Sequence, residues 1–236
     1  MSPHSVCVII PAFNEQGSVS AVVREVRQHL PAATVVVIDD GSSDATASKA
    51  GTAGATVIRM PVNIGIGGAV QAGYMYALRR HFSVAVQVDG DGQHDPEEIV
   101  RLLAPLLSGE ADLIVGSRWL GRGHYSGSRT RRVGMRLLAQ FVHWKTGLVL
   151  TDPTSGFRAI GPSGLQLFTK NYPADFPEVE ALVLAAKAGL RVMEVPVRMR
   201  PRLHGRSSIG GVKAAYYMLR VSTAVALQAA TEKRPR

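Results

Sequence analysis

The stretch AVQVDGDGQHDPEEIV, residues 85–100, joins an apolar run to the start of a helix through a turn rich in acids. The run AVQV is short and almost wholly apolar, which is typical of a parallel strand buried on both faces. Two aspartates follow it on either side of Gly90, and glycine lets such a turn tighten. Asp95 before Pro96 is a good N-cap for the next segment. The stretch therefore predicts a strand, a turn and a helix, with carboxylates gathered where the strand ends.

The same alternation of strand and helix extends over the first half of the chain. Apolar runs predict strands at 6–12, 34–40, 56–60, 83–89 and 111–118. Helical periodicity and N-terminal caps predict helices at 17–30, 43–54, 67–81 and 95–109. This order predicts an α/β fold with a Rossmann-like, mostly parallel sheet flanked by helices.

The pattern changes after about residue 119. The sequence predicts a Gly/Ser-rich loop, a polar loop around TDPTSGFRA and, in addition, an amphipathic helix at 131–147, a strand at 190–199 and a weakly amphipathic helix at 212–230. We expect one domain over residues 1–211, followed by a C-terminal helix and basic tail over 212–236.

Composition limits the class of protein. The chain has 236 residues, of which 46% are apolar, and this suits one globular domain with an appendage. Cys7 is the only cysteine, so no disulfide can form within the chain. No secretory signal is visible, and no apolar stretch reaches the roughly 18 residues needed to span a bilayer. We expect a cytoplasmic protein that is soluble or bound peripherally to the cytoplasmic face of the membrane.

The net charge of +9 is unevenly distributed. Residues 1–100 carry 6 Lys/Arg and 10 Asp/Glu, a net charge of −4, and the remainder carries 21 Lys/Arg and 8 Asp/Glu, a net charge of +13. Such asymmetry favours an anionic partner: a nucleic acid, a membrane surface or a phosphorylated substrate. A merely solubilising basic surface is the simpler alternative.

Polar side chains follow three of the predicted strands, where open α/β sheets bind their ligands. These are Asn14 and Glu15, Asp39 and Asp40, and Asp89 and Asp91. Two carboxylates as close in sequence as Asp89 and Asp91 repel each other unless a cation lies between them. Mg²⁺ or Mn²⁺ prefers such oxygen ligands, and Gln93 offers another. The alternative is a solvated loop that caps a helix. His94 is either a further ligand or, as is more usual, a residue that faces solvent.

Six motifs in this order resemble those of one known family: VIIPAFNE, VVVIDDGSSDAT, NIGIGGAVQAGY, VQVDGDGQHDPEEI, IVGSRWL and DPTSGFRA. The chain resembles a family 2 glycosyltransferase with the GT-A fold over about residues 5–212. More narrowly, it resembles the synthases that attach mannose or glucose to polyprenol or dolichol phosphate. The domain over 1–211 would then be the catalytic domain.

The resemblance implies a nucleotide-sugar donor (GDP-mannose or a UDP-sugar), Mg²⁺ or Mn²⁺, and inversion at the anomeric carbon. It implies these donor-site residues: Pro11, Phe13 and Glu15 for the nucleoside, Val37 and Asp39 for the base, Asp89, Gly90 and Asp91 for the diphosphate, and Arg118, Arg202 and Ser208 for its phosphates. It implies that the metal ligands are Asp89, Asp91 and Gln93. Asp91 and Arg118 are the implied catalytic residues.

The resemblance also implies a polyprenyl phosphate acceptor, whose phosphate would face Arg118 and Arg132. An alcohol acceptor needs a general base, whereas a lipid phosphate is already anionic and needs mainly a positive seat. The sequence offers positive charge for such a phosphate-binding site, since seven Lys/Arg and no acid lie between Asp112 and Asp152. Whether Glu178 or Glu180 has a catalytic role stays open.

Several other functions are weighed against this one. A transferase of the same family could use a soluble alcohol, a glycan or a natural product as acceptor. A basic nucleic-acid-binding module would explain the charge of the second part but not the acids at the strand ends, so we expect no nucleic-acid partner. A nucleotidyltransferase is disfavoured because PAFNEQGS lacks the basic residue of that class's glycine-rich signature. A Rossmann dehydrogenase is disfavoured because PAFNE, not a glycine-rich turn, follows the first strand. The helices at 131–147 and 212–230 could lie on a membrane surface or pack in the interior. The oligomeric state is left open.

Overall fold

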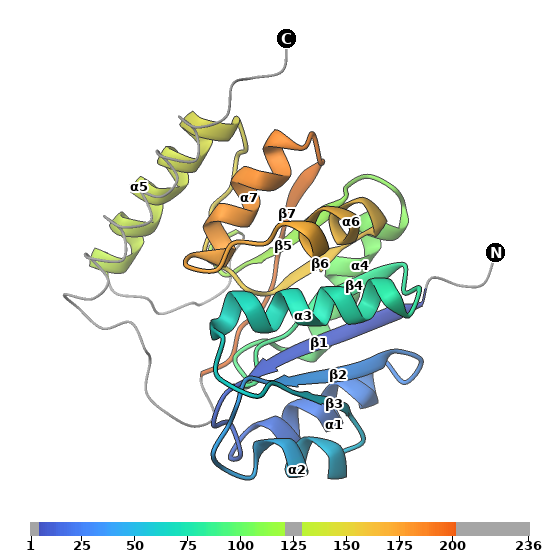
Figure 1. Ribbon diagram of the computed structural model, residues 1–236. Coiled ribbons are helices and arrows are strands. Elements are labelled where there is room, and N and C mark those ends of the chain that lie inside the picture. Colours follow the sequence, from blue (N-terminus) through green and yellow to red (C-terminus); the bar gives the residue numbers. More distant parts are fainter. Residues whose placement is uncertain (1–4, 121–128, 202–236) are drawn as a thin grey trace.

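The computed structural model describes residues 5–120 and 129–201. These residues form one seven-stranded sheet with helices on both faces (Figure 1). The strands are β1 (Val6–Ala12), β2 (Thr34–Asp39), β3 (Thr56–Arg59), β4 (Val84–Gln87), β5 (Leu113–Ser117), β6 (Arg158–Ile160) and β7 (Val192–Pro196). The helices are α1 (Val19–His29), α2 (Thr46–Thr52), α3 (Gly65–Arg79), the 3₁₀ helix η1 (Pro96–Glu98), α4 (Ile99–Leu107), α5 (Arg129–Thr146), α6 (Pro162–Lys170) and α7 (Pro177–Lys187).

The strand order is β3-β2-β1-β4-β6-β5-β7, and only β6 runs antiparallel to its neighbours. The carboxyl ends of β1, β2, β4 and β5 therefore meet at one edge of the sheet, which we call the carboxyl edge. Because β6 runs the other way, the loop that precedes it arrives at this same edge. The topology thus adds the DPTSGFR segment to the acidic strand ends.

Alternation along β1 shows why the strands are apolar throughout. Cys7 and Ile9 pack into the core under α3, α5, α6 and α7, whereas Val8 and Ile10 pack under α1 and α4. All four side chains are fully buried. The sheet is covered on both faces, as the continuous apolar runs predict.

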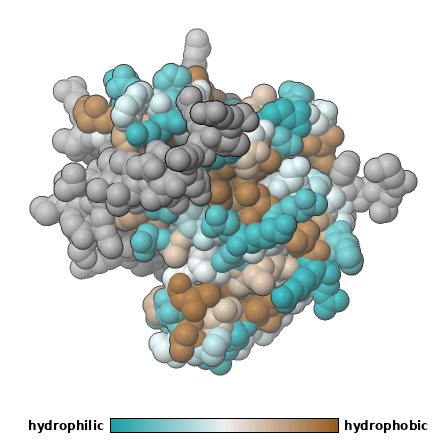
Figure 2. Space-filling model, turned by 45° about the horizontal axis from the view of Figure 1, so that its top comes forward, coloured by the Kyte–Doolittle hydropathy of each residue, from teal (hydrophilic) through white to brown (hydrophobic). Residues whose placement is uncertain are grey.

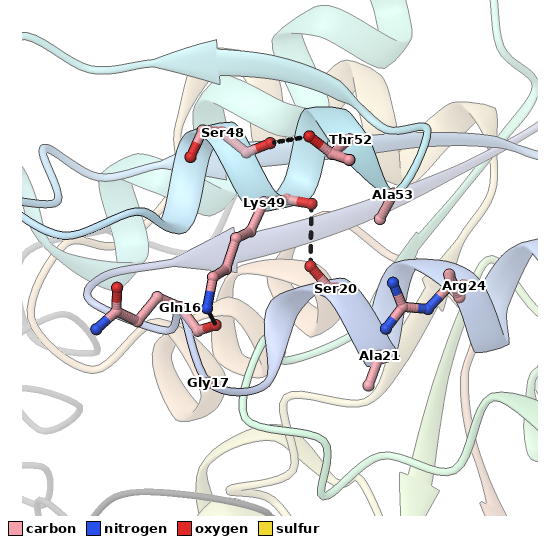
Figure 3. Close-up of a pocket in the computed structure, with 9 residues that line it drawn as sticks. All are labelled: Gln16, Gly17, Ser20, Ala21, Arg24, Ser48, Lys49, Thr52 and Ala53. Atoms are coloured by element: carbon pink, nitrogen blue, oxygen red, sulfur yellow. Dashed lines mark hydrogen bonds between the residues drawn. The ribbon is translucent and has the colours of Figure 1, made fainter.

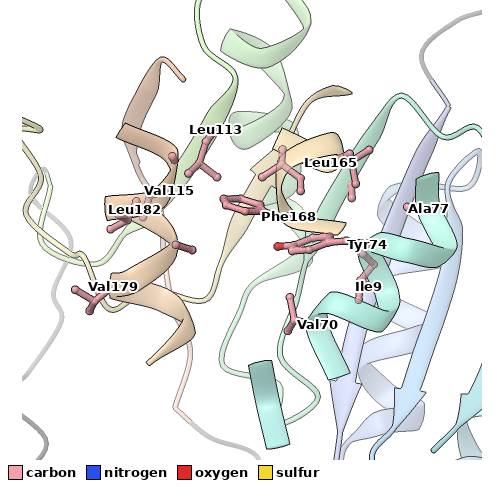
Figure 4. Packing of buried hydrophobic residues seen from close by; sticks show 14 of the residues in the cluster. Ile9, Val70, Tyr74, Ala77, Leu113, Val115, Leu165, Phe168, Val179 and Leu182 are labelled. Atoms are coloured by element: carbon pink, nitrogen blue, oxygen red, sulfur yellow. The ribbon is translucent and has the colours of Figure 1, made fainter. Parts of the chain in front are cut away.

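Helix α3 lies directly against β1. A Cβ on Gly73 would come within 2.3 Å of Ile9 Cγ2, so only glycine permits this approach. The next residue, Tyr74, is buried and stacks on Phe168 of α6 with ring centroids 5.9 Å apart (Figure 4). This packing connects α6, through α3, to β1.

The sequence predicts most of these elements. All six predicted strands and the helices as far as α5 are confirmed, with boundaries that differ by a few residues. The predicted helix at 95–109 is a 3₁₀ turn followed by α4. Elements β6, α6 and α7 were not predicted. The expected helix at 212–230 and the tail lie outside the described residues.

Candidate active site

Two loops at the carboxyl edge, which follow β1 and β2, are joined by hydrogen bonds. The Asn14 N–H donates to Ser42 Oγ at 2.9 Å, and the Glu15 N–H donates to Thr46 Oγ1 at 2.8 Å. Asn14 has a φ of 55°, a region that asparagine enters more readily than most residues. Phe13, in the same loop, has 48% of its surface exposed. The paired loops thus present an aromatic side chain at the end of β1.

Asp39 and Asp40, at the end of β2, have different partners. Asp39 is fully buried, and its Oδ1 accepts the Ser42 N–H at 3.1 Å. Its Oδ2 has no hydrogen-bond partner among the described residues and lies 3.4 Å from Arg59 Nε. Asp40 instead accepts two consecutive backbone N–H groups at the start of α3, at 2.8 and 3.0 Å. Asp40 therefore caps α3, while Asp39 has a buried carboxylate oxygen that accepts no hydrogen bond from the described residues.

The turn after β4, residues 88–95, carries the acidic motif, and the buried His94 ring contacts both the backbone and the carboxylate of Asp89. The His94 Nδ1 accepts the Asp89 N–H at 3.0 Å, and Nε2 lies 3.5 Å from Asp89 Oδ2. The ring is buried and stacks on Phe157 at a centroid distance of 4.7 Å. The expectation that His94 faces solvent is therefore wrong. Since Nδ1 accepts, the proton of the neutral ring is on Nε2, directed at the carboxylate.

Two glycines allow the backbone to approach this turn closely. A Cβ on Gly90 would come within 3.2 Å of the Pro11 carbonyl oxygen, so the turn lies against the end of β1. A Cβ on Gly156, in the loop before β6, would lie 3.3 Å from Asp89 Oδ1. Three segments that are distant in sequence therefore converge on Asp89.

The acidic turn carries oxygen groups of the kind that a hard divalent cation prefers. Asp91 Oδ1 accepts the Gln93 N–H at 2.9 Å, which fixes the turn, and the Asp89 side chain remains 35% exposed. Within residues 5–120 and 129–201, no group of three His, Cys, Asp or Glu side chains is arranged to hold a metal. Two carboxylates and an amide oxygen suit Mg²⁺ or Mn²⁺, which keeps several positions for waters and phosphate oxygens.

Arg118 follows β5 at the same edge and is held by a buried carboxylate. Its Nε donates to Asp152 Oδ2 at 2.6 Å and its Nη2 donates to Asp152 Oδ1 at 2.7 Å. Arg118 is 13% exposed at the side chain and Asp152 is fully buried. The next residue, Trp119, lies under the guanidinium of the exposed Arg132, 5.7 Å from the ring centroid. One of the two arginines predicted to face an acceptor phosphate thus lies over the tryptophan that directly follows the other.

Arg158, at the start of β6, is a buried cation that the structure satisfies with carbonyl groups. It donates to the carbonyl oxygens of Ser155, Pro153 and Glu178 at 2.8, 3.2 and 2.6 Å. Its Nη1 has no hydrogen-bond partner in the part of the chain that the structure describes. Arg158 therefore shapes the DPTSGFR loop and ties it to the start of α7.

Glu178 and Glu180, at the start of α7, have different surroundings. Burial raises the pKa of Glu178, the nearby Arg158 opposes this, and Asp89 and Arg118 also act on the carboxyl. Burial together with Asp175 raises the pKa of Glu180. Of the two, Glu178 is the one in electrostatic contact with both the acidic turn and Arg118.

The segment that follows β7 runs against the acidic turn. The Arg200 N–H donates to the Gln93 carbonyl oxygen at 2.8 Å, and Met199 forms an isolated antiparallel bridge with His94. The Arg200 guanidinium also donates to Asp95 Oδ1 at 2.8 Å. This segment leads to Arg202 and Ser208, which lie outside the described residues.

The remaining predicted positions are found where the strands end. Pro11 and Val37 are buried in β1 and β2, next to the loop that holds Phe13. Glu15 accepts the Ser18 hydroxyl at 2.7 Å. One functional candidate that the sequence analysis missed is Glu194 of β7, whose carboxylate accepts the backbone N–H groups of Thr151 and Asp152. An acid inside the otherwise apolar run VMEVPV is the signal that marks it.

A groove of about 410 Å³ lies between α1 and α2 (Figure 3). None of the residues assigned to the donor or acceptor site lines it. Lys49 Nζ donates to the Gln16 carbonyl oxygen at 3.0 Å, and the Ser20 hydroxyl of α1 donates to the Lys49 carbonyl oxygen of α2 at 3.0 Å, so the two helices are tied together. The groove is thus separate from the acidic turn.

Comparison with known proteins decides the family. The family model for glycosyl transferase family 2 matches residues 7–160, which is more than half of the chain. The chain belongs to this family. An undecaprenyl-phosphate mannosyltransferase of Micrococcus luteus is 33% identical over 218 residues, covering 87% of this chain and 88% of the relative. A polyprenol monophosphomannose synthase of Mycolicibacterium smegmatis is 31% identical over 228 residues, covering 91% of this chain and 84% of the relative.

A solved structure supports the fold of this family 2 glycosyltransferase. Glucosyl-3-phosphoglycerate synthase from Mycobacterium tuberculosis, in complex with Mn²⁺, UDP and phosphoglyceric acid, superposes with a TM-score of 0.74. It is 23% identical, and the match covers 98% of this chain and 80% of that one. The GT-A fold expected from the sequence is confirmed. In the described part of this glycosyltransferase, no helix has the length and apolar character needed to cross a membrane.

Proposed function

We propose that this glycosyltransferase moves a sugar, with inversion, from GDP-mannose or a UDP-sugar to a polyprenyl phosphate in a metal-dependent reaction. The observation that carries the proposal is the presence, at one edge of the sheet, of an acidic turn and of an arginine that a buried carboxylate holds. Asp89 and Asp91 suit a metal-bound diphosphate, and Arg118, fixed by Asp152, suits a second phosphate. Relatives at 31% and 33% identity, named for polyprenol and undecaprenyl phosphate, support this acceptor class.

On the donor side, the unsatisfied Oδ2 of buried Asp39 suits a donor N–H of the base. Pro11, Phe13, Glu15 and Val37, which lie in or just after β1 and β2, would surround the nucleoside there. Asp89, Asp91 and Gln93, with Gly90 between them, would hold Mg²⁺ or Mn²⁺. When bound, the ion neutralises the negative charge that develops on the leaving diphosphate.

The chain after β7 adds positive charge to the donor side of the proposal. Arg200 is bonded to the acidic turn and stands two residues before Arg202. This supports the assignment of Arg202, and of Ser208 further along, to the donor phosphates. Residues 1–211 would form the catalytic domain, with residues 212–236 as a C-terminal helix and tail.

On the acceptor side, Arg118 and Arg132 would hold the phosphate of the acceptor. A phosphate oxygen is already a nucleophile, so the protein has to orient it toward the anomeric carbon and needs no general base. Arg118 is directed by two charge-assisted bonds to Asp152, and a guanidinium fork suits phosphate oxygens. No residue has to change its protonation state in this step.

Helix α5 supplies a surface for lipid. Val133, Leu137 and Trp144 are 55%, 60% and 73% exposed, and their spacing places them along one side of the helix. The helix contains no acid, and Arg132 and Arg136 flank the exposed apolar residues. We propose that this side of α5 rests on the cytoplasmic face of an anionic membrane. Over the coloured part of the face seen in Figure 2, apolar and polar side chains are interspersed.

A soluble alcohol, glycan or natural product is the second candidate acceptor. The surroundings of Glu178 favour it, because a carboxyl whose pKa is raised by burial suits a general base. A nucleic-acid partner has no support from the described edge, where carboxylates follow three strands.

The experiment offers labelled GDP-mannose and UDP-glucose, with Mn²⁺, to the purified protein. The acceptors are undecaprenyl phosphate in vesicles, 3-phosphoglycerate and an alkyl glucoside. The proposal predicts label in the lipid fraction only, lost in Arg118→Ala and retained in the surface control Arg79→Ala. Label on the alkyl glucoside or on 3-phosphoglycerate alone would replace the lipid acceptor by a soluble one.

A further inference from the structure

Glu194 is an acid in the middle of β7, where the strand pairs with β5. The register sets Glu194 beside Val115. Its carboxylate does not bond to β5 but to the start of the DPTSGFR loop. Glu194 Oε1 accepts the Asp152 N–H at 2.7 Å, and Oε2 accepts the Thr151 N–H at 2.8 Å and the Thr151 hydroxyl at 2.9 Å. One side chain therefore fixes two consecutive backbone N–H groups.

The residues fixed in this way are those that hold Arg118. Asp152 grips two nitrogens of the guanidinium and also accepts the Arg118 N–H at 3.1 Å. Thr151 Oγ1 lies 2.7 Å from the hydroxyl of Ser117, the residue before Arg118. The contacts thus run without a gap from Glu194 through the loop to both the backbone and the side chain of Arg118.

The strand alone does not require an acid at this position. Burial raises the pKa of the Glu194 carboxyl, and the neighbouring charge of Asp152 adds to this, so the ionised form is costly to hold there. An apolar side chain would serve β7 better, as at its neighbours Val192 and Val195. The cost of burying the Glu194 carboxylate is offset by the hydrogen bonds with which it orders the loop at Thr151 and Asp152.

The direction of Arg118 depends on that order. Asp152 occupies the edge of the guanidinium formed by Nε and Nη2, so it determines the plane of the group and the direction of Nη1. A shift of the Asp152 backbone would rotate this plane and move the guanidinium away from a bound phosphate. Misplacement by about 1 Å can cost roughly 100-fold in rate.

We propose that Glu194 is a positioning residue that orients Arg118, through Asp152, toward the phosphate of the acceptor. The acceptor part of this inference rests on the function proposed above, whereas the effect on Arg118 does not. Glu194 touches neither substrate. It acts by holding the two N–H groups that set the position of the Asp152 carboxylate.

The test uses Glu194→Gln in the full chain, with Glu110→Gln as a control at an exposed position in the turn after α4. The amide NH₂ of glutamine cannot accept an N–H, so the loop loses at least one of its bonds. Two readouts are followed. The first is the side-chain Nε–H signal of Arg118 in ¹⁵N-arginine NMR, which needs no substrate. The second is kcat/KM for undecaprenyl phosphate, with nucleotide affinity measured alongside.

We expect the Arg118 signal to shift and to exchange faster with water in Glu194→Gln. We expect kcat/KM for the lipid phosphate to fall roughly 10- to 100-fold, and nucleotide affinity to fall much less, because the acidic turn would still hold the donor. In an Arg118→Lys background, Glu194→Gln should cost little more, because the two residues act in one chain of contacts. If Glu194→Gln does not fold, Thr151→Val, which removes one hydroxyl, should give the same changes at smaller amplitude.

An unchanged Arg118 signal in a folded Glu194→Gln protein would overturn the inference. Additive losses of activity in the double variant would also overturn it. So would equal losses in nucleotide affinity and in kcat/KM for the lipid phosphate, because equal losses indicate a general structural role. A shifted signal in a protein that transfers no sugar to lipid phosphate would uphold the positioning of Arg118 and refute the proposed acceptor.

Discussion

The His94 ring accepts the backbone N–H of Asp89 at 3.0 Å, and its other nitrogen lies 3.5 Å from Asp89 Oδ2. Stacking on Phe157 fixes the plane of the ring. One buried side chain therefore sets both the backbone and the carboxylate of the first acid in the turn.

His94→Ala should weaken metal-dependent nucleotide binding without removing a metal ligand. Loss of a residue that orients a ligand typically costs roughly 10- to 100-fold in affinity. Titration of the nucleotide in the presence of Mn²⁺ measures this loss. His29→Ala, at the exposed end of α1, should bind like wild type, and an unchanged affinity in His94→Ala would contradict the role of the ring.

Gly73→Ala should destabilise the fold. The new methyl group would lie 2.3 Å from Ile9 Cγ2, so α3 would have to move away from β1. Overpacking of this kind typically costs about 1–3 kcal/mol. Urea denaturation measures the change, and Gly51→Ala in α2, whose Cβ would meet only Val57 at 3.8 Å, is the control that should not destabilise. Equal stability of the two variants would show that the contact relaxes freely.

Leu137→Asp should reduce binding to anionic vesicles while leaving the melting temperature nearly unchanged. The side chain is 60% exposed on α5, so its loss removes apolar surface that the lipid would cover rather than core packing. Cosedimentation with vesicles measures binding. Val100→Asp, at a 56% exposed position on α4, should bind as wild type does. Equal binding by all three proteins would place the lipid contact elsewhere.

Glu178→Gln should gain stability relative to wild type as the pH rises. Burial raises the pKa of Glu178 above the usual 4.5, against the opposing effect of Arg158. Because the folded-state pKa is the higher one, the carboxyl stabilises the fold fully below the unfolded-state pKa and loses this contribution as the pH rises through the folded-state value. The free energy of unfolding of both proteins is measured between about pH 4 and pH 8. The advantage of Glu178→Gln over wild type should grow as the pH rises above about 4.5. An advantage that narrows over this range would contradict the burial effect.

The fold was predictable wherever the local pattern of apolar and polar residues is enough to identify a strand or a helix. Runs such as VCVII are apolar because both faces of the sheet are covered, and the acids after β2 and β4 share an edge because parallel strands end together. Strand β6 could not be predicted from the sequence because it has only three residues and runs antiparallel. Helix α7 could not be predicted because it is buried on most sides and therefore shows no polar stripe in the sequence.

The site was predictable in its residue types but not in its supporting contacts. Asp89, Asp91 and Arg118 stand in recognisable motifs. The residues that hold them do not, because His94 depends on Phe157 and Glu194 depends on the loop at Thr151, partners that only the folded chain brings together. Asp40 resembles Asp39 in the sequence, yet only the structure separates a helix cap from a residue with an unsatisfied oxygen.

The most direct test of the central claim is calorimetric titration of UDP and of GDP, each with Mn²⁺ and with EDTA. The proteins are wild type, Asp91→Asn, and the exposed control Asp175→Asn. Asparagine keeps the oxygen that accepts the Gln93 N–H but removes the charge, so the turn should stay intact. The account predicts that one nucleotide binds wild type and the control only with Mn²⁺, and that Asp91→Asn loses this binding. Failure of both nucleotides to bind wild type with Mn²⁺, or equal binding by Asp91→Asn, would contradict it.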